Sequence, residues 1–171
     1  GLVADIFTEE RIKKLPGHAA IGHTRYSTTG GSISVNIQPI LVNFALGGLA
    51  VAHNGNLVNA SLLKAELEAY GSIFQSTMDS EVVIHLIAQC RMATLQERIV
   101  DALQHLQGSY SLLLLAEDQL IGVRDPRGFR PLVIGQVGEG YVLASETCAL
   151  DLIHAKFVRD LEPGEVVVIN Q

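Results

Sequence analysis

The 171-residue chain is 48% hydrophobic and 18% charged, a composition that is typical of one globular domain and excludes intrinsic disorder. Its net charge is −6 and its basic residues do not cluster, so we expect no nucleic-acid partner. The sequence contains no apolar run long enough to span a bilayer and no signal-peptide pattern, so we expect no membrane partner and a cytoplasmic location.

The first third of the chain mixes polar segments with short apolar runs. A short helix is expected over 5–14, and a strand over 19–26 that enters a Thr/Ser/Gly loop at 27–34. Two further apolar runs, 37–44 and 48–53, predict strands. The first of these is an edge or irregular strand, because Pro39 has no N–H to donate to a sheet.

Three helices are expected in the middle of the chain. The first begins after Asn59, ends near Gly71, and carries apolar residues at helical spacing. The second begins after Asp79, a residue type that often caps helices. The third covers 94–105, where Thr94 opens the capping-box pattern Thr-x-x-Glu.

The last third consists of short apolar runs that Gly, Pro and Asp separate. These runs predict strands at 110–115, 120–123, 132–134, 141–144 and 166–169. Strands followed by helices and then by strands favour an α+β fold built on antiparallel sheet over a doubly wound fold. The sequence shows no repeat or linker, so we expect one domain over 1–171.

Metal-binding patterns are missing from the sequence. None of the six histidines forms a His-x-x-x-His pair, and the two cysteines do not form Cys-x-x-Cys, so we expect no metal cofactor in this chain. Cys90 and Cys148 lie in apolar context and are expected to be buried residues of a reducing compartment.

Three polar features have both a structural and a functional interpretation. Arg25 ends an apolar segment beside hydroxyl residues, where it could hold a ligand carboxylate or pair with a structural Asp. Asp79 could cap a helix or accept from a ligand ammonium. Asn54 and Gly55, between apolar runs, are typical of a hairpin turn, yet an amide donor beside a glycine N–H could also form an oxyanion hole.

Six motifs together identify a resemblance. The segments "GHTRYSTTG", "AHNGNLVNA" and "STMDSEV" occur in the order found in class II glutamine amidotransferase domains, whose nucleophile is N-terminal. Farther along the chain, "VRDPRGFRPLVIG", "YVLASETCALD" and "VRDLEPGEVVVI" resemble the amidophosphoribosyltransferase branch of that family. The resemblance covers nearly the whole chain.

The resemblance implies a fold and a set of roles. The fold is a four-layer αββα sandwich of two antiparallel sheets, the N-terminal nucleophile hydrolase fold. Asn54 and Gly55 would form the oxyanion hole for hydrolysis of the glutamine amide. Arg25, helped by Thr28, would bind the substrate carboxylate, and Asp79 would bind its ammonium. In this family an N-terminal cysteine attacks the amide carbon, with its own α-amino group as base.

The resemblance also implies parts that this sequence does not contain. The chain starts at Gly1, and neither Cys90 nor Cys148 matches the nucleophile. We therefore expect the first strands, the nucleophile and the phosphoribosyltransferase domain to be missing, and this chain alone to be inactive. The full-length protein would make 5-phosphoribosylamine from phosphoribosyl pyrophosphate, with ammonia from glutamine, in de novo purine biosynthesis.

Further expectations concern the full-length protein. The absent phosphoribosyltransferase domain would use magnesium, and the full-length chain would form a homo-oligomer. Some family members carry an iron–sulfur cluster, for which this sequence offers no ligand set. Two alternatives stay open: the glutaminase domain of another class II amidotransferase, and a non-catalytic glutamine-binding module that lacks the nucleophile.

Overall fold

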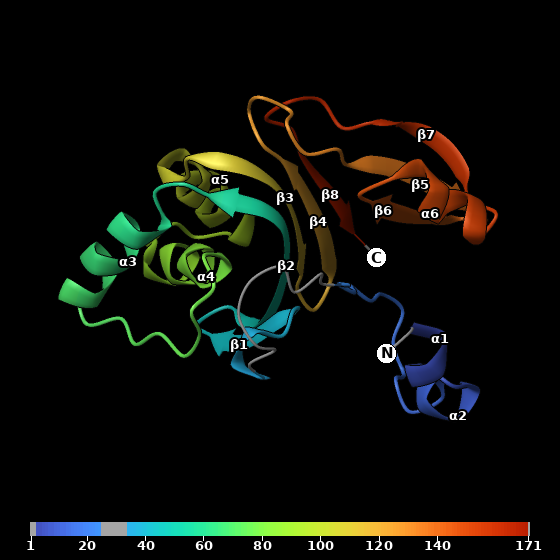
Figure 1. Cartoon of the computed structure of the whole chain (residues 1–171), viewed down its shortest axis with the longest axis horizontal. Coiled ribbons are helices and arrows are strands. Elements are labelled where there is room, and N and C mark those ends of the chain that lie inside the picture. Colours follow the sequence, from blue (N-terminus) through green and yellow to red (C-terminus); the bar gives the residue numbers. More distant parts are fainter. Residues whose placement is uncertain (1–2, 25–33, 171) are drawn as a thin grey trace.

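Two antiparallel sheets form the centre of the molecule (Figure 1). The computed structural model describes residues 3–24 and 34–170, so the predicted loop with Arg25 and Thr28 lies outside the described residues. The larger sheet has the order β1-β2-β3-β4-β8 and the smaller sheet β6-β5-β7. The strands are β1 (Ile40–Phe44), β2 (Gly47–Leu57), β3 (Gly108–Leu115), β4 (Gln119–Arg124), β5 (Val133–Val137), β6 (Gly140–Ala144), β7 (Lys156–Asp160) and β8 (Val166–Asn170).

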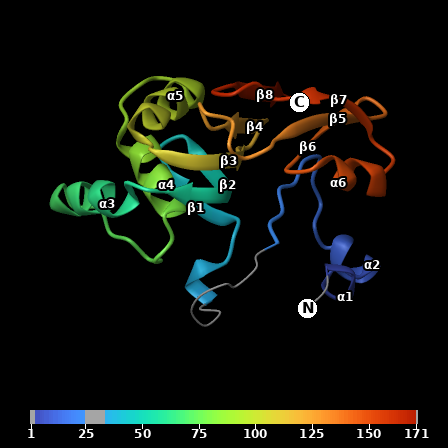
Figure 2. The same cartoon turned by 45° about the horizontal axis from the view of Figure 1, so that its top comes forward.

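The longer helices cover the outer faces of the two sheets, whereas α1 and α2 lie apart from both sheets (Figure 1). The helices are α1 (Val3–Ile6), α2 (Glu9–Ile12), the 3-10 helix η1 (Ser34–Asn36), α3 (Ala60–Ala69), α4 (Ser80–Gln89), α5 (Leu95–His105) and α6 (Thr147–Leu152). Helices α3, α4 and α5 gather on one side of the larger sheet, and α6 lies beside the smaller sheet (Figures 1 and 2). The layers therefore follow the order αββα, and the predicted α+β sandwich of two antiparallel sheets is confirmed.

Alternate side chains of the larger sheet pack into two different hydrophobic cores, one on each face of the sheet. On β3, Leu112 and Leu114 belong to the core shared with the helices, whereas Leu113 packs against the cluster of the smaller sheet. That second cluster contains Ile134 and Leu143, from β5 and β6. Both faces of the larger sheet are apolar because successive side chains of a strand point to opposite faces.

Helix α6 covers the outer face of the smaller sheet at a glycine. A Cβ added to Gly135 of β5 would meet the Leu150 side chain of α6 at 2.7 Å, so the helix packs directly on the strand backbone. Leu150 is 1% exposed. Strand β7 was not expected, because its side chains are exposed and its sequence lacks an apolar run.

The interpretation of Asn54-Gly55 as a hairpin turn is wrong. Both residues lie inside β2, where they pair with Ser111 and Tyr110 of β3. Gly55 has φ +154°, and an added Cβ would collide with the Ser109 carbonyl oxygen. The absence of a side chain at Gly55 thus allows β2 and β3 to approach closely, and the residue does not form a turn.

Other local predictions had mixed outcomes. The three central helices and the capping box at Thr94 are confirmed, as is the edge position of β1 after Pro39. The helix predicted over 5–14 is instead the two short helices α1 and α2, and the described residues 19–24 form no strand. Among the residues described, no helix combines the length and apolar character that a membrane span requires.

Candidate active site

The end of β2 and the start of α4 meet at Asp79. Its Oδ2 accepts a hydrogen bond from the Leu57 backbone N–H at 2.9 Å. Asp79 occupies the cap position before α4, but among the described groups its carboxylate makes no cap hydrogen bond to the helix. The side chain bonds to the strand that carries Asn54 and Gly55, so this residue links the predicted ammonium site to the predicted oxyanion site.

The Asp79 carboxylate is held in its ionised form. Burial by itself raises the pKa of Asp79, but the hydrogen bond and electrostatic interaction with His53, together with the backbone N–H of Leu57, outweigh this effect and lower the pKa below its ordinary value. The side chain remains 26% exposed. A partly exposed carboxylate with a lowered pKa suits an incoming ammonium group.

The Asn54 side chain lies at the junction of the two sheets. Its Nδ2 donates to Ser145 Oγ, just after β6, over 3.4 Å. The opposite residue in β3, Ser111, donates from Oγ to the Pro131 carbonyl at 2.9 Å. A bond of 3.4 Å is weak, so the Asn54 amide can exchange Ser145 for a better acceptor at low cost.

The loop that leads into α4 is fixed by a buried acid that the sequence analysis did not single out. Glu81 is 7% exposed, and its carboxylate accepts from the backbone N–H of Gln75 and of Ser76, each at 2.8 Å. One residue farther on, Thr77 and Asn36 exchange two hydrogen bonds of 2.8 and 3.1 Å. These contacts define the path of the chain immediately before Asp79. The only sequence feature that pointed to Glu81 was its place as an acidic residue in the first turn of the predicted helix.

A second buried acid organises the loop at 126–130. The Asp125 carboxylate is 0% exposed and accepts from the N–H groups of Arg127, Phe129 and Arg130 at 3.0 to 3.2 Å. Burial raises the pKa of Asp125, and these N–H donors lower it below its usual value. Arg124 binds the same loop through the Gly128 and Arg130 carbonyls. The motif "RDPRGFRP" therefore stabilises its own loop.

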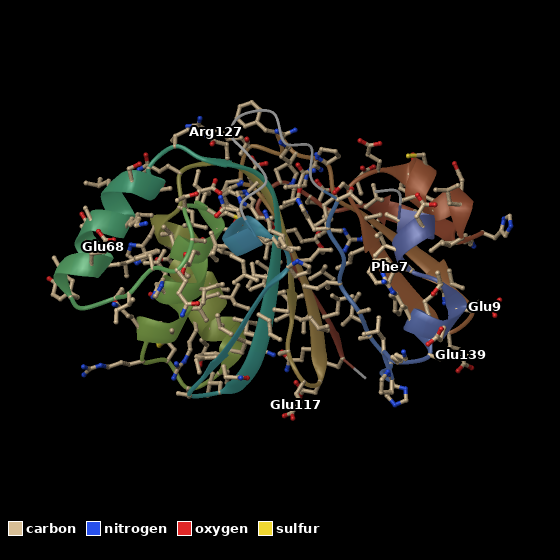
Figure 3. All side chains as sticks on the ribbon, turned by 60° about the horizontal axis from the view of Figure 1, so that its bottom comes forward. Phe7, Glu9, Glu68, Glu117, Arg127 and Glu139 are labelled. Atoms are coloured by element: carbon tan, nitrogen blue, oxygen red, sulfur yellow. The ribbon has the colours of Figure 1, made fainter. Side chains whose placement is uncertain are left out.

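This loop borders a groove beside the strand end. The groove has a volume of about 680 Å³, and its lining includes Asn56, Ser109, Arg127, Phe129 and Arg130. Figure 3 shows Arg127 at the rim of the molecule, projecting away from the packed interior. The groove thus lies next to β2 just beyond the Asn54-Gly55 pair.

Neither cysteine supplies a thiolate to this site. Cys90 follows the last residue of α4, about 16 Å along the helix from Asp79. Cys148 donates to Glu146 Oε2 at 3.4 Å, and this contact raises the pKa of the thiol, so it stays protonated at neutral pH. Cys148 is exposed and Cys90 half-buried, which corrects the expectation that both are buried.

Metal ligands are not grouped in the described part of the chain. Residues 3–24 and 34–170 contain no group of three or more His, Cys, Asp or Glu side chains placed to hold an ion. Arg25 and Thr28 lie outside these ranges, so their predicted contacts with a carboxylate stay predictions.

Comparison with known families identifies the domain. A family model described as "Glutamine amidotransferase domain" matches residues 23–152, which include Asn54, Gly55 and Asp79. The chain belongs to this family. The amidotransferase domain is also similar to amidophosphoribosyltransferase 3, chloroplastic, of Arabidopsis thaliana, with 54% identity over all of this chain and 32% of the relative. Amidophosphoribosyltransferase of Bacillus subtilis is 47% identical over 99% of this chain and 36% of its own length.

Solved structures agree with the sequence relatives. The glutamine phosphoribosylpyrophosphate amidotransferase from B. subtilis, complexed with ADP and GMP, matches with a TM-score of 0.92 and 46% identity, over 99% of the amidotransferase domain and 37% of that chain. A second structure, described as the allosteric regulatory enzyme of purine biosynthesis, matches with a TM-score of 0.95 and 47% identity over the same shares. The amidotransferase domain spans about a third of the length of these relatives.

Proposed function

We propose that this chain is the glutaminase part of an amidophosphoribosyltransferase. The enzyme would hydrolyse glutamine and use the ammonia to make 5-phosphoribosylamine from phosphoribosyl pyrophosphate, in purine biosynthesis. Two relatives that bear this name match 100% and 99% of the chain, at 54% and 47% identity. The structural observation that supports it most is the hydrogen bond from Leu57 N–H to Asp79, because it joins an ionised carboxylate to the strand of Asn54 and Gly55.

In the proposed mechanism the chain binds glutamine at both ends. Asp79 accepts the α-ammonium, and Arg25 with Thr28 holds the α-carboxylate. The amide oxygen faces Asn54 Nδ2 and the Gly55 N–H, two donors for the negative charge that develops when a nucleophile adds to the amide carbon. Family resemblance assigns the nucleophile to an N-terminal cysteine, which this sequence does not include. The C–N bond of the amide then breaks and ammonia leaves with a proton, so the glutamyl group stays on the cysteine as a thioester. Water then hydrolyses this thioester and releases glutamate.

Other properties of the whole protein are part of the same proposal. The phosphoribosyltransferase part would use magnesium, and the protein would be a homo-oligomer. A cytoplasmic location stays a prediction, and the names of the plant relatives include the word "chloroplastic". An iron–sulfur cluster would need ligands from outside this chain.

The proposed oxyanion role is tested in the full-length protein that the complete gene encodes. Asn54→Ala should lower kcat for glutamine by roughly 10²–10³, the usual effect of losing one oxyanion donor, while activity with added ammonia persists. Asn56→Ala is the matched control, because Asn56 lies two residues farther along the same strand and is exposed. Equal loss of both activities in Asn54→Ala would contradict the role.

The same assay separates the enzyme from a binding module. A non-catalytic module would bind glutamine with wild-type Asp79 but release no glutamate. The gene upstream of Gly1 gives a further check, since a cysteine codon at the mature start supports the enzyme.

A further inference from the structure

His53 is a buried side chain to which the proposed mechanism assigns no role. Its side chain is 1% exposed, and its Nδ1 lies 3.0 Å from Ser80 Oγ and 3.4 Å from Asp79 Oδ1. Its backbone N–H donates to Gln38 Oε1 at 2.7 Å. Both the ring and the backbone of His53 are therefore fixed, and the ring contacts the first residues of α4.

The contacts of the ring determine which nitrogen carries the proton. The ionised Asp79 carboxylate can only accept a hydrogen bond, and Ser80 Oγ donates to Asp79 Oδ1 at 3.4 Å. The His53 Nδ1 therefore carries a proton and donates towards this pair. Oδ1 of Asp79 faces His53 and Ser80, while Oδ2 accepts from Leu57. Both oxygens of the carboxylate are thus oriented before any ligand arrives.

The opposite edge of the ring lies against Gly55. Nε2 of His53 is the one buried side-chain nitrogen or oxygen in the described part of the chain with no hydrogen-bond partner. A Cβ built on Gly55 would lie 2.9 Å from this atom. The imidazole ring therefore fills the space between the Asp79 carboxylate and the Gly55 backbone. A polar atom in this position is costly to bury, and an apolar side chain would fill the space without that cost.

This arrangement matters because a short side chain joins the α-ammonium of glutamine to its amide carbon, so the separation of the two groups has a narrow range. A site that binds one end and stabilises charge at the other must hold both sets of protein groups at a matching separation. We propose that His53 is a positioning residue for glutamine: its ring orients the Asp79 carboxylate and supports the Gly55 backbone without touching the substrate. This inference rests on the proposed function.

A matched pair of substitutions tests the role of the Nδ1 donor. Asn and Leu have similar branched shapes, and only Asn can donate towards Ser80 and Asp79 from the position of Nδ1. In the full-length protein, His53→Leu should raise KM for glutamine about tenfold and change kcat less than threefold, whereas His53→Asn should keep KM within threefold of wild type. Activity with added ammonia reports that each variant is folded.

A comparison of two inhibitors tests whether His53 acts through Asp79. Glutamate carries the α-ammonium, and glutarate is the same diacid without it. His53→Leu should raise the inhibition constant of glutamate about tenfold and leave that of glutarate within twofold of wild type. Should His53→Leu fail to fold, His53→Gln takes its place with the same expectation, because its longer side chain places the amide near Nε2 and not near Nδ1.

The outcomes are distinct. The inference is overturned if His53→Leu and His53→Asn have the same KM for glutamine. It is also overturned if His53→Leu raises the inhibition constants of glutamate and glutarate equally. The proposed function fails separately, if the wild-type full-length protein neither binds nor hydrolyses glutamine.

Discussion

Asp79 accepts the backbone N–H of Leu57 at 2.9 Å, and this contact joins the start of α4 to the end of β2. The two residues are 22 positions apart in the sequence. Since Leu57 follows Asn54 and Gly55 on the same strand, a shift of α4 along the sheet would move the carboxylate relative to both. The contact therefore couples helix packing to the geometry of the candidate site.

We predict that Asp79→Asn separates the charge of this residue from its structural role. The Asn side chain keeps an oxygen that can accept from Leu57 but loses the charge that pairs with an ammonium. KM for glutamine should rise at least about tenfold, with ammonia-dependent activity preserved. Asp79→Ala should also lower the free energy of unfolding by about 1–3 kcal/mol, because the Leu57 N–H loses its acceptor. An unchanged KM in Asp79→Asn would show that glutamine ammonium binds elsewhere.

We predict that Gly55→Ala is strongly destabilising. The added Cβ would collide with the Ser109 carbonyl oxygen and lie 2.8 Å from Tyr110 Cα, at a φ that side chains rarely adopt. Overpacking and backbone strain together should cost about 3–6 kcal/mol in urea unfolding. Gly71→Ala is the control, since Gly71 has φ +91° but open space around it, and should cost only about 1–2 kcal/mol. Equal costs would contradict the close approach of β2 and β3.

We predict that Asp125 contributes to stability only above acidic pH. Its folded-state pKa is lowered, so its contribution is complete above the unfolded pKa of about 3.9 and is lost as the pH falls through the folded value. Wild type should therefore lose free energy of unfolding as the pH drops from 5 to about 3. Asp125→Asn should be about 2–4 kcal/mol less stable at pH 7 and show a shallower pH slope, because the buried carboxylate accepts three N–H groups.

The control for this experiment is Asp118→Asn on the exposed β3–β4 turn. Its free energy of unfolding at pH 7 should stay within about 0.5 kcal/mol of wild type. If Asp125→Asn keeps the full pH slope of wild type, the acid sensitivity arises from other carboxylates.

We predict that Glu81→Gln affects both stability and glutamine binding. The amide replaces one of two oxygens that accept from Gln75 and Ser76 with an N–H₂ group, which faces donors. The free energy of unfolding should fall by about 1.5–3 kcal/mol. KM for glutamine should rise severalfold, because the loop before Asp79 loosens. Glu66→Gln, on the exposed face of α3, should change neither quantity, and a normal KM in Glu81→Gln would separate this loop from the site.

Local sequence patterns predicted much of the fold. The helical spacing of Leu63 and Leu67, the capping box at Thr94 and the apolar runs of β3 and β4 each depend on neighbouring residues alone. The resemblance of six motifs then indicated how the layers are arranged. Strand β7 escaped prediction because its side chains are exposed, and its pairing with β5 is a long-range contact.

The sequence by itself determined the residue types of the site and their order along the chain: an Asn-Gly pair, and an Asp before a helix. Only the tertiary structure decided what these residues do locally. Asn54-Gly55 continues a strand because pairing with β3 outweighs the local turn preference. Asp79 accepts from Leu57 instead of capping its own helix, and His53 lies between Asp79 and Gly55. These relationships arise from packing between distant segments, which no local pattern encodes.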